Sequence, residues 1–192
     1  MKQLSILFLL FFCTDVFAQT QNDYTIRQLK NGEFTNDETY VYALPFEQGK
    51  KVYLVQAYDS KLSHKGEFAL DFKVKEGTTI CAAREGTVIA VRSDSDKGGL
   101  NPDNLSDGNY ISIQHGDGSV AHYWHLQKNG VKVNVGDTVS KGQQIGNSGN
   151  TGYSAFAHLH FEVVQNGKQQ PTRFQTKKGI KYLRPSRFYR AN

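Results

Sequence analysis

The chain has 192 residues, a formal net charge of +5 and a hydrophobic content of 38%. This length fits one domain with some elaboration. Beyond residues 1–18, no segment is long and apolar enough to cross a membrane, and no nucleic-acid-binding motif accompanies the positive charge. Glycine is abundant, proline is scarce and aromatic residues are frequent, which favours a domain built from β-strands.

Residues 1–18 have the features of a cleaved secretory signal. Lys2 supplies a positively charged start, and the apolar run Leu4–Phe12 is too short to span a bilayer as a helix. The segment Val16–Ala18 places small residues where a signal peptidase cuts. We therefore expect a mature chain that begins at Gln19 and is exported to the periplasm or the extracellular space.

Short apolar runs separated by Gly, Asn, Asp and Ser clusters predict eight strands. They cover residues 52–58, 68–74, 78–83, 87–92, 110–115, 120–125, 143–147 and 160–165. Residues 114–119 are typical of a tight hairpin turn between two of these strands. After signal removal Cys81 is the one remaining cysteine, so we expect no internal disulfide and a small buried hydrophobe inside a strand.

One short pattern occurs twice in the chain. Val-x-x-Gly-x-Thr-Ile at residues 74–80 returns as Val-x-x-Gly-x-Thr-Val at residues 133–139, and each copy is followed by a second glycine turn. Two similar strand-turn-strand units indicate duplication. The predicted fold class is therefore all-β: an antiparallel folded-over sheet, or barrel-sandwich-like duplicated motif, with loops that line a cleft.

Several titratable residues could share a metal site. His158 and His160 flank Leu159 at the start of an apolar strand, so their side chains share one face. Either this pair is one satisfied core histidine beside a surface one, or it binds a metal. His64 precedes a strand that contains Asp71, a carboxylate that is costly to bury unless it is paired or bound to a cation. His125 ends another strand, where we expect it on the same face as the residue two before it.

An ordered set of motifs resembles the lysostaphin-like zinc metalloendopeptidases, which cut peptide bonds in peptidoglycan. The matching text runs from about residue 60 to 165 and includes His64 to Asp71-Phe72, Tyr123-Trp124-His125-Leu126, Gly136-Asp137-Thr138-Val139, Ser148-Gly149-Asn150-Thr151-Gly152 and His158-Leu159-His160-Phe161-Glu162-Val163. An ordered set of this length is far more specific than one short motif. The duplicated unit also resembles the repeated hybrid motif of that fold.

The resemblance implies a role for five residues. His64, Asp71 and His160 match the ligands of one Zn²⁺, which leaves the open position typical of catalytic zinc. His125 and His158 match the two catalytic histidines. We assign His158 as the general base and His125 as the group that stabilises the oxyanion, with the reverse assignment left open. Six residues separate the first two ligands where the best-known members have three, so the extra residues should form a loop before the strand.

Other polar residues have simpler explanations. We expect a structural or surface role for His122 and a structural hydrogen bond for His115. Glu162 could orient His160 as a partner beyond the metal ligands, or form a cross-strand ion pair. The acidic loop 93–109 does not match a calcium-binding loop, and we expect it to form one wall of a cleft.

The chain divides into four predicted segments: a signal peptide at 1–18, an N-terminal extension packed on the domain at 19–60, a zinc metallopeptidase domain at 61–170 and a basic segment at 171–192. From residue 163 onward the chain has eight Lys and Arg and no Asp or Glu. Either this stretch is a solvated basic tail, or it attracts an anionic polymer of the cell envelope.

The predicted function is that of an exported zinc endopeptidase that hydrolyses the stem-peptide cross-links of peptidoglycan. One alternative is a non-catalytic module that binds peptidoglycan or activates another hydrolase. Another is a secreted zinc-binding signalling protein. Relatives in those two classes lack some of the ligands or catalytic histidines, whereas this chain retains all five positions, which favours the enzyme.

Overall fold

The computed structural model describes residues 26–33 and 40–192. The predicted signal peptide and the expected start at Gln19 lie outside these residues. Residues 26–30 are helical, and a 3-10 helix, η1, covers Pro102–Asp107. The strands are β1 (Val41–Tyr42), β2 (Lys51–Gln56), β3 (Ala69–Lys73), β4 (Thr79–Cys81), β5 (Gly86–Arg92), β6 (Gly98–Gly99), β7 (Asn109–Gln114), β8 (Val120–Val131), β9 (Thr138–Val139), β10 (Gln144–Ser148), β11 (Gly152–Tyr153), β12 (His158–Gln165), β13 (Lys168–Gln169), β14 (Arg173–Thr176), β15 (Gly179–Lys181) and β16 (Arg187–Arg190).

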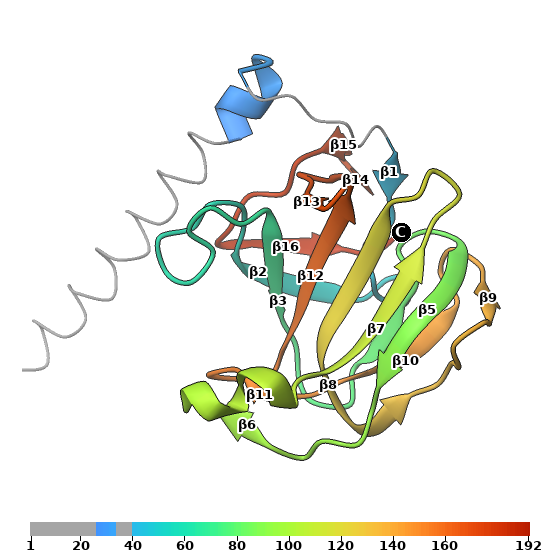
Figure 1. Ribbon diagram of the computed structural model, residues 1–192. Helices are drawn as coiled ribbons and strands as arrows, with labels where there is room; N and C mark the ends of the chain where they lie inside the picture. The colour runs from blue at the N-terminus through green and yellow to red at the C-terminus, as the bar shows by residue number, and fades with distance from the viewer. Residues whose placement is uncertain (1–25, 34–39) are drawn as a thin grey trace, which may run out of the picture.

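One large sheet organises the described chain (Figure 1). Its strand order is β16-β2-β3-β12-β8-β7-β5-β9, and β4, β10 and β13 attach beside this path. The small sheet β1-β14-β15 lies at one end in Figure 1, and the β6-β11 pair lies at the other. All eight predicted strands are present and pair antiparallel, so the all-β prediction is confirmed. None of the described helices is long and apolar enough to span a membrane.

The two copies of the repeated pattern exchange their strands. The first copy leads into β4 and β5, and the second into β9 and β10. β4 pairs with β10, and β5 pairs with β9, so each unit completes the other. Both turns have a glycine with positive φ, 76° at Gly77 and 95° at Gly136, a conformation that other residues rarely adopt. The predicted duplication is therefore visible in the pairing of the strands.

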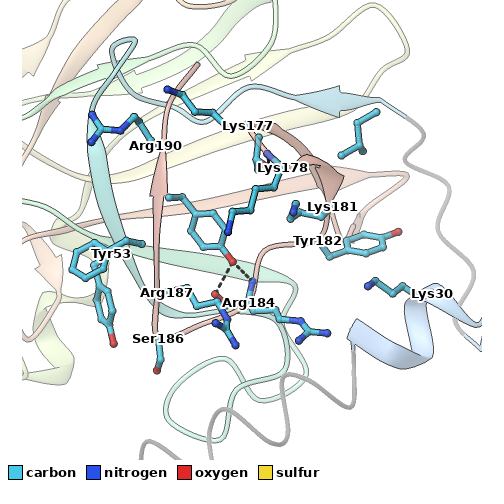
Figure 2. Close-up of a pocket in the computed structure, with 14 residues that line it drawn as sticks. Lys30, Tyr53, Lys177, Lys178, Lys181, Tyr182, Arg184, Ser186, Arg187 and Arg190 are labelled. Atoms are coloured by element: carbon cyan, nitrogen blue, oxygen red, sulfur yellow. Dashed lines mark hydrogen bonds between the residues drawn. The ribbon is translucent and has the colours of Figure 1, made fainter.

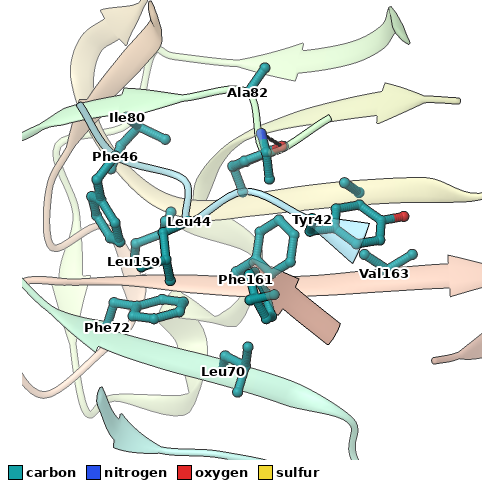
Figure 3. Packing of buried hydrophobic residues seen from close by; sticks show 14 of the residues in the cluster. Tyr42, Leu44, Phe46, Leu70, Phe72, Ile80, Ala82, Leu159, Phe161 and Val163 are labelled. Atoms are coloured by element: carbon teal, nitrogen blue, oxygen red, sulfur yellow. Dashed lines mark hydrogen bonds between the residues drawn. The ribbon is translucent and has the colours of Figure 1, made fainter. Parts of the chain in front are cut away.

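The centre of the sheet separates a packed core from a polar face. β12 pairs with β3 in a register that sets His160 opposite Asp71 and Leu159 opposite Phe72. Because side chains alternate along a strand, the apolar partners face the core while the titratable ones face the other side. Figure 3 shows the core side, where Phe72, Leu159 and Phe161 pack beside other buried residues.

Both ends of the described chain contribute to the main sheet. β2 comes from the predicted N-terminal extension and β16 from the predicted basic segment, and they pair with each other next to β3. The buried side chains of Tyr42 and Phe174 also join the core. The predicted segment boundaries stay predictions, but residues on both sides of them pack as part of one core. Cys81 is buried and free, and burial raises the pKa of its thiol to about 11.

Candidate metal centre

Three side chains from distant parts of the chain converge on the polar face. His64, Asp71 and His160 each place one ligand atom within 4.8 Å of the others. Nδ1 of His160 lies 2.9 Å from Oδ1 of Asp71, and Nε2 of His64 lies 3.2 Å from Oδ2. The two rings meet edge to face, with their centroids 5.0 Å apart. The carboxylate is thus held between two imidazoles.

A compact loop brings His64 to this point. The backbone N–H of Asp59 donates to the carbonyl of Glu67, and that of Glu67 donates to the carbonyl of His64. The Asp59 side chain accepts from the backbone of Gly66, whose φ is 79°. The six residues between His64 and Asp71 therefore form a turn and the start of β3, as the spacing predicts.

Asp71 is ionised although it is buried. Its exposed fraction is 7%, and burial raises the pKa of the carboxyl. The hydrogen bonds and the charges of His160 and His64 outweigh burial and hold the pKa well below its usual range. The same contact with Asp71 outweighs burial at His160 and raises the pKa of that imidazole. A cation that binds here would replace the proton that holds the two together.

A glutamine that the sequence did not single out supports Asp71. Nε2 of Gln56 donates to Oδ2 of Asp71 at 2.8 Å. Its Oε1 accepts from Oγ of Ser60 at 2.9 Å and from the backbone N–H of Ser63. Gln56 is 4% exposed and lies at the end of β2. In the sequence, Gln56 is the polar residue that follows the apolar run of this strand, and this was the only hint of its role, because Gln56 belongs to no motif.

These residues fit a zinc ion. Two imidazoles and one ionised carboxylate form a donor set that zinc accepts. The geometry brings three candidate ligand side chains together. The buried Nδ1 of His64 has no hydrogen-bond partner in the described part of the chain, so the contact of Nε2 with Asp71 is the polar contact that orients this ring.

His125 and His158 lie beside this cluster. Their ring centroids are 4.5 Å apart, and His125, His158 and His160 form a second group of close ligand atoms. Nδ1–H of His125 donates to the carbonyl of Thr151 at 2.7 Å, and Nδ1–H of His158 donates to the carbonyl of Phe156 at 2.8 Å. In both neutral rings Nε2 is therefore the acceptor.

The expected orientation of His125 is wrong, because β8 contains a bulge there. Trp124 pairs with Tyr110 and Leu126 pairs with Asn109, so His125 is an extra residue without a partner on β7. Its φ is 64°, a left-handed conformation. The bulge turns the imidazole to the polar face, whereas Tyr123 points into the core and accepts a hydrogen bond from the backbone of Ala83.

Burial keeps both of these histidines neutral. Burial, together with the neighbouring His158 and His160, lowers the pKa of His125 to about 3. Burial also lowers the pKa of His158, although Asp71 opposes this shift. Nε2 of His158 lies 3.6 Å from Oδ1 of Asp71. Of His125 and His158, it is therefore His158 whose protonated form the carboxylate of Asp71 would stabilise by direct contact.

The five residues line a cleft with a volume of about 770 Å³. Loop 93–109 forms one wall, as expected, because Leu100, Leu105 and Gly108 line the cleft. Tyr153 and Phe156 line it as well. Three of the four acidic side chains of this loop pair with cations: Asp94 and Asp107 with Arg92, and Asp96 with Lys128.

A glycine permits the close packing of this wall. Gly152 has a φ of 80°, and a Cβ atom there would lie 2.8 Å from Cα of Gly108. Such a Cβ would also lie 3.5 Å from Nδ1 of His125. The glycine-rich run before the His158 strand therefore brings two backbones together next to the site.

The remaining polar residues stay outside the metal group. His122 shares a hydrogen bond of 2.8 Å with Ser112, and His115 bonds the carbonyl of Glu85 at 2.7 Å. Glu162 accepts from the indole of Trp124 at 3.2 Å and from Gln169. These contacts correspond to neither of the two predicted roles of Glu162.

Comparison with known proteins gives the family. The profile of peptidase family M23 matches residues 63–171, more than half of the chain. The chain belongs to peptidase family M23. It is 37% identical over 98 residues to the peptidoglycan DD-endopeptidase ShyA of Vibrio cholerae, and 33% identical over 123 residues to lysostaphin of Staphylococcus simulans. These matches cover 51% and 64% of this chain but only 20% and 23% of the two relatives.

A solved structure agrees with the fold. A zinc-containing peptidase from Vibrio cholerae is 25% identical and has a TM-score of 0.51, over 67% of this chain and 38% of that one. The lysostaphin-like resemblance is thus confirmed, and the family to which this chain belongs includes relatives named as peptidoglycan endopeptidases.

Proposed function

We propose that this M23 protein is an exported, zinc-dependent endopeptidase that hydrolyses peptide cross-links of peptidoglycan. The observation that carries the proposal is the convergence of His64, Asp71 and His160 beside two neutral histidines in one cleft. The names of its relatives supply the substrate class. Export follows from the predicted signal peptide and from the extracellular position of the substrate.

His64, Asp71 and His160 would hold the zinc ion. When bound, zinc supplies a Lewis acid that polarises a peptide carbonyl and makes water a usable nucleophile near neutral pH. The hydrogen bond from Gln56 fixes the carboxylate of Asp71, so the ligand set is positioned before the ion binds.

His158 is proposed as the general base. Its Nε2 accepts a proton from the attacking water, and Asp71 stabilises the resulting imidazolium. The proton then passes to the leaving amine. Nε2 of His125 is also an acceptor in the neutral ring, so His125 donates to an oxyanion only after it has taken up a proton from the solvent. The negative charge that develops on the carbonyl oxygen favours that protonation.

The cleft suits an extended peptide substrate. It is open along the wall formed by Leu105 and Tyr153, both exposed. Glu67 and Glu162 add negative charge at its edge, which would attract the free amino groups of stem peptides.

The decisive experiment compares His160→Ala with His122→Ala. We expect the wild-type protein and H122A to hold about one zinc per chain and to release cross-link fragments from purified cell walls. H160A should lose both properties, because it lacks one of three ligands. Mass spectrometry of the fragments identifies the bond that is cut. Full lytic activity of H160A, or a zinc-loaded wild-type protein that only stimulates another hydrolase, would reject the proposal.

A further inference from the structure

A second cavity lies apart from the metal centre. Its volume is about 890 Å³, and none of its lining residues lines the catalytic cleft. Figure 2 shows it between β16, the β14-β15 hairpin and helix 26–30. We call it the basic groove, and its lining residues are Lys30, Tyr53, Thr176, Lys177, Lys178, Ile180, Lys181, Tyr182, Arg184, Ser186, Arg187, Phe188, Tyr189 and Arg190.

The charge of the basic groove is of one sign. Among the described residues that line it, seven are lysine or arginine and none is acidic. Within the described part of the chain, Lys177, Lys178 and Arg187 are exposed and form no ion pair. Like charges that gather without counterions repel one another and destabilise the fold. An anionic ligand would relieve this repulsion.

The scaffold of the groove is ordered by hydrogen bonds. The hydroxyl of Tyr189 accepts from the backbone N–H of Arg184 at 2.7 Å and donates to its carbonyl at 3.0 Å. Arg190 donates to the carbonyl of Gly49 at 2.7 Å. Thr176 donates to the carbonyl of Gly179 and closes the β14-β15 turn. The cations therefore project from a built concave surface and not from a free tail.

We propose that the basic groove binds a linear phosphate polymer, with one anionic group in each repeat. The cations come from helix 26–30, the β14-β15 hairpin and β16, so one phosphate group is too small to meet them all, whereas a chain of phosphates can follow the hollow. Three of the seven are arginines, whose paired N–H donors match phosphate oxygens.

Two other polyanionic partners fit less well. Nucleic-acid bases need an open aromatic face on which to stack. The exposed ring of Phe188 already has Nζ of Lys51 above it at 4.2 Å and Tyr53 beside it at 5.0 Å. An anionic membrane would favour a flat face with a broad apolar surface. Of the described residues that line this hollow, only the apolar residues Ile180 and Phe188 are exposed.

The groove and the catalytic cleft are connected by one strand. Tyr53 of β2 lines the groove, whereas Val55 and Gln56 of the same strand line the cleft. A polymer held in the groove would thus keep the cleft near the material to which that polymer is attached. The binding itself does not depend on the proposed hydrolysis, and it can be measured separately.

The test compares two variants with the same loss of charge. The groove variant carries Lys177→Gln, Lys178→Gln and Arg187→Gln. The control variant carries Lys75→Gln, Lys132→Gln and Lys141→Gln at exposed positions outside the groove. Fluorescence anisotropy measures binding of labelled poly(glycerol phosphate) to the purified protein. Thermal unfolding and hydrolysis of a soluble peptide, measured beforehand, show that both variants are folded.

We expect the groove variant to bind at least about tenfold more weakly at about 50 mM salt. The slope of log K against log salt concentration should become shallower by about two to three, because three phosphate contacts are lost. The control variant should change by less than about twofold. Equal losses in both variants, or no binding by the wild-type protein, would overturn the proposal. Tighter binding of polyglutamate of equal charge would overturn the assignment to phosphate, and tighter binding of single-stranded DNA would assign the groove to nucleic acid instead.

Discussion

At the scale of single residues, two side chains of the cleft depend on features that lie outside the motifs. His125 is presented by a bulge with a positive φ, and Asp71 is held by Gln56. Both place a functional group, and strained or polar arrangements of this kind persist where function requires them.

Replacement of Gln56 should weaken metal binding without unfolding the protein. Gln56→Leu removes the donor to Asp71 and leaves the hydroxyl of Ser60 without its acceptor. We expect zinc affinity to fall about 10- to 100-fold, measured by competition with a chelator. Gln114→Leu, an exposed glutamine on β7, is the control and should bind zinc as the wild-type protein does. Unchanged affinity in Q56L would show that Asp71 needs no such support.

The left-handed backbone at His125 predicts an order of stability between two variants. His125→Gly and His125→Ala both remove the imidazole and its hydrogen bond to Thr151. Glycine adopts a φ of 64° without strain, whereas alanine does not. H125G should therefore be more stable than H125A by about 1 kcal/mol in urea unfolding. Equal stabilities would mean that the bulge relaxes when the ring is lost.

The five predicted site residues line one cleft, and their roles as ligands and catalytic groups stay predictions. Local patterns marked His158, His160 and Asp71 as candidates, whereas the roles of all five came from the resemblance to the family. Gln56 was missed because its role depends on the pairing of β2 with β3, a contact between strands that no local pattern encodes. The orientation of His125 was predicted wrongly, since regular alternation cannot anticipate an extra residue in one strand.

At the scale of elements, the β7-β8 turn is attached to the β4-β5 turn. Asp117 in the first turn accepts from Nη1 of Arg84 in the second at 2.7 Å. The guanidinium of Arg84 also lies over the ring of Tyr40, at 3.9 Å from its centroid. One buried cation thus connects two turns and the N-terminal strand region.

This ion pair predicts a loss of stability at acid pH. Burial raises the pKa of Asp117, but hydrogen bonds from Ser119 and Arg84 outweigh it and bring the pKa down to about 2. The stabilisation is therefore complete above about pH 4, the unfolded-state pKa, and disappears as the pH falls to about 2. Asp117→Asn should cost about 1 kcal/mol at pH 7, a value reduced for partial exposure. The difference from wild type in thermal unfolding should vanish near pH 2, and a constant difference would contradict this assignment.

The C-terminal strands β14, β15 and β16 were not among the eight that the sequence predicted. The stretch after residue 170 is rich in Lys and Arg, which is typical of a solvated tail. In the structure its apolar residues, Phe174 and Leu183, are buried in the common core while the cations line the groove. The alternation is short and irregular here, because β14, β15 and β16 contain only four, three and four residues.

At the scale of the whole molecule, residues on both sides of the predicted peptidase domain belong to its hydrophobic core. Phe174 is fully buried and its ring packs against Phe161 and Tyr42, with centroids 5.9 and 6.3 Å apart. Phe161 belongs to β12, the strand that bears His158 and His160. The basic segment is thus connected to β12 through the core.

Two phenylalanines of the basic segment should therefore differ strongly. Phe174→Ala leaves a cavity in the core and should lower the free energy of unfolding by about 3–5 kcal/mol. Phe188 is 62% exposed, so Phe188→Ala should cost less than about 1 kcal/mol. Urea unfolding of both variants measures the difference. Similar small effects would mean that residues 171–192 form a separable tail.

The exchanged pairing of β4 with β10 and β5 with β9 has a consequence for biosynthesis. The strands of the first repeat lack these hydrogen-bond partners until the second repeat has been synthesised. A partly synthesised domain therefore cannot complete its fold. Such non-local closure slows folding. If the chain is exported as proposed, this delay keeps it unfolded during translocation across the membrane. The proposed peptidase would then fold only after export.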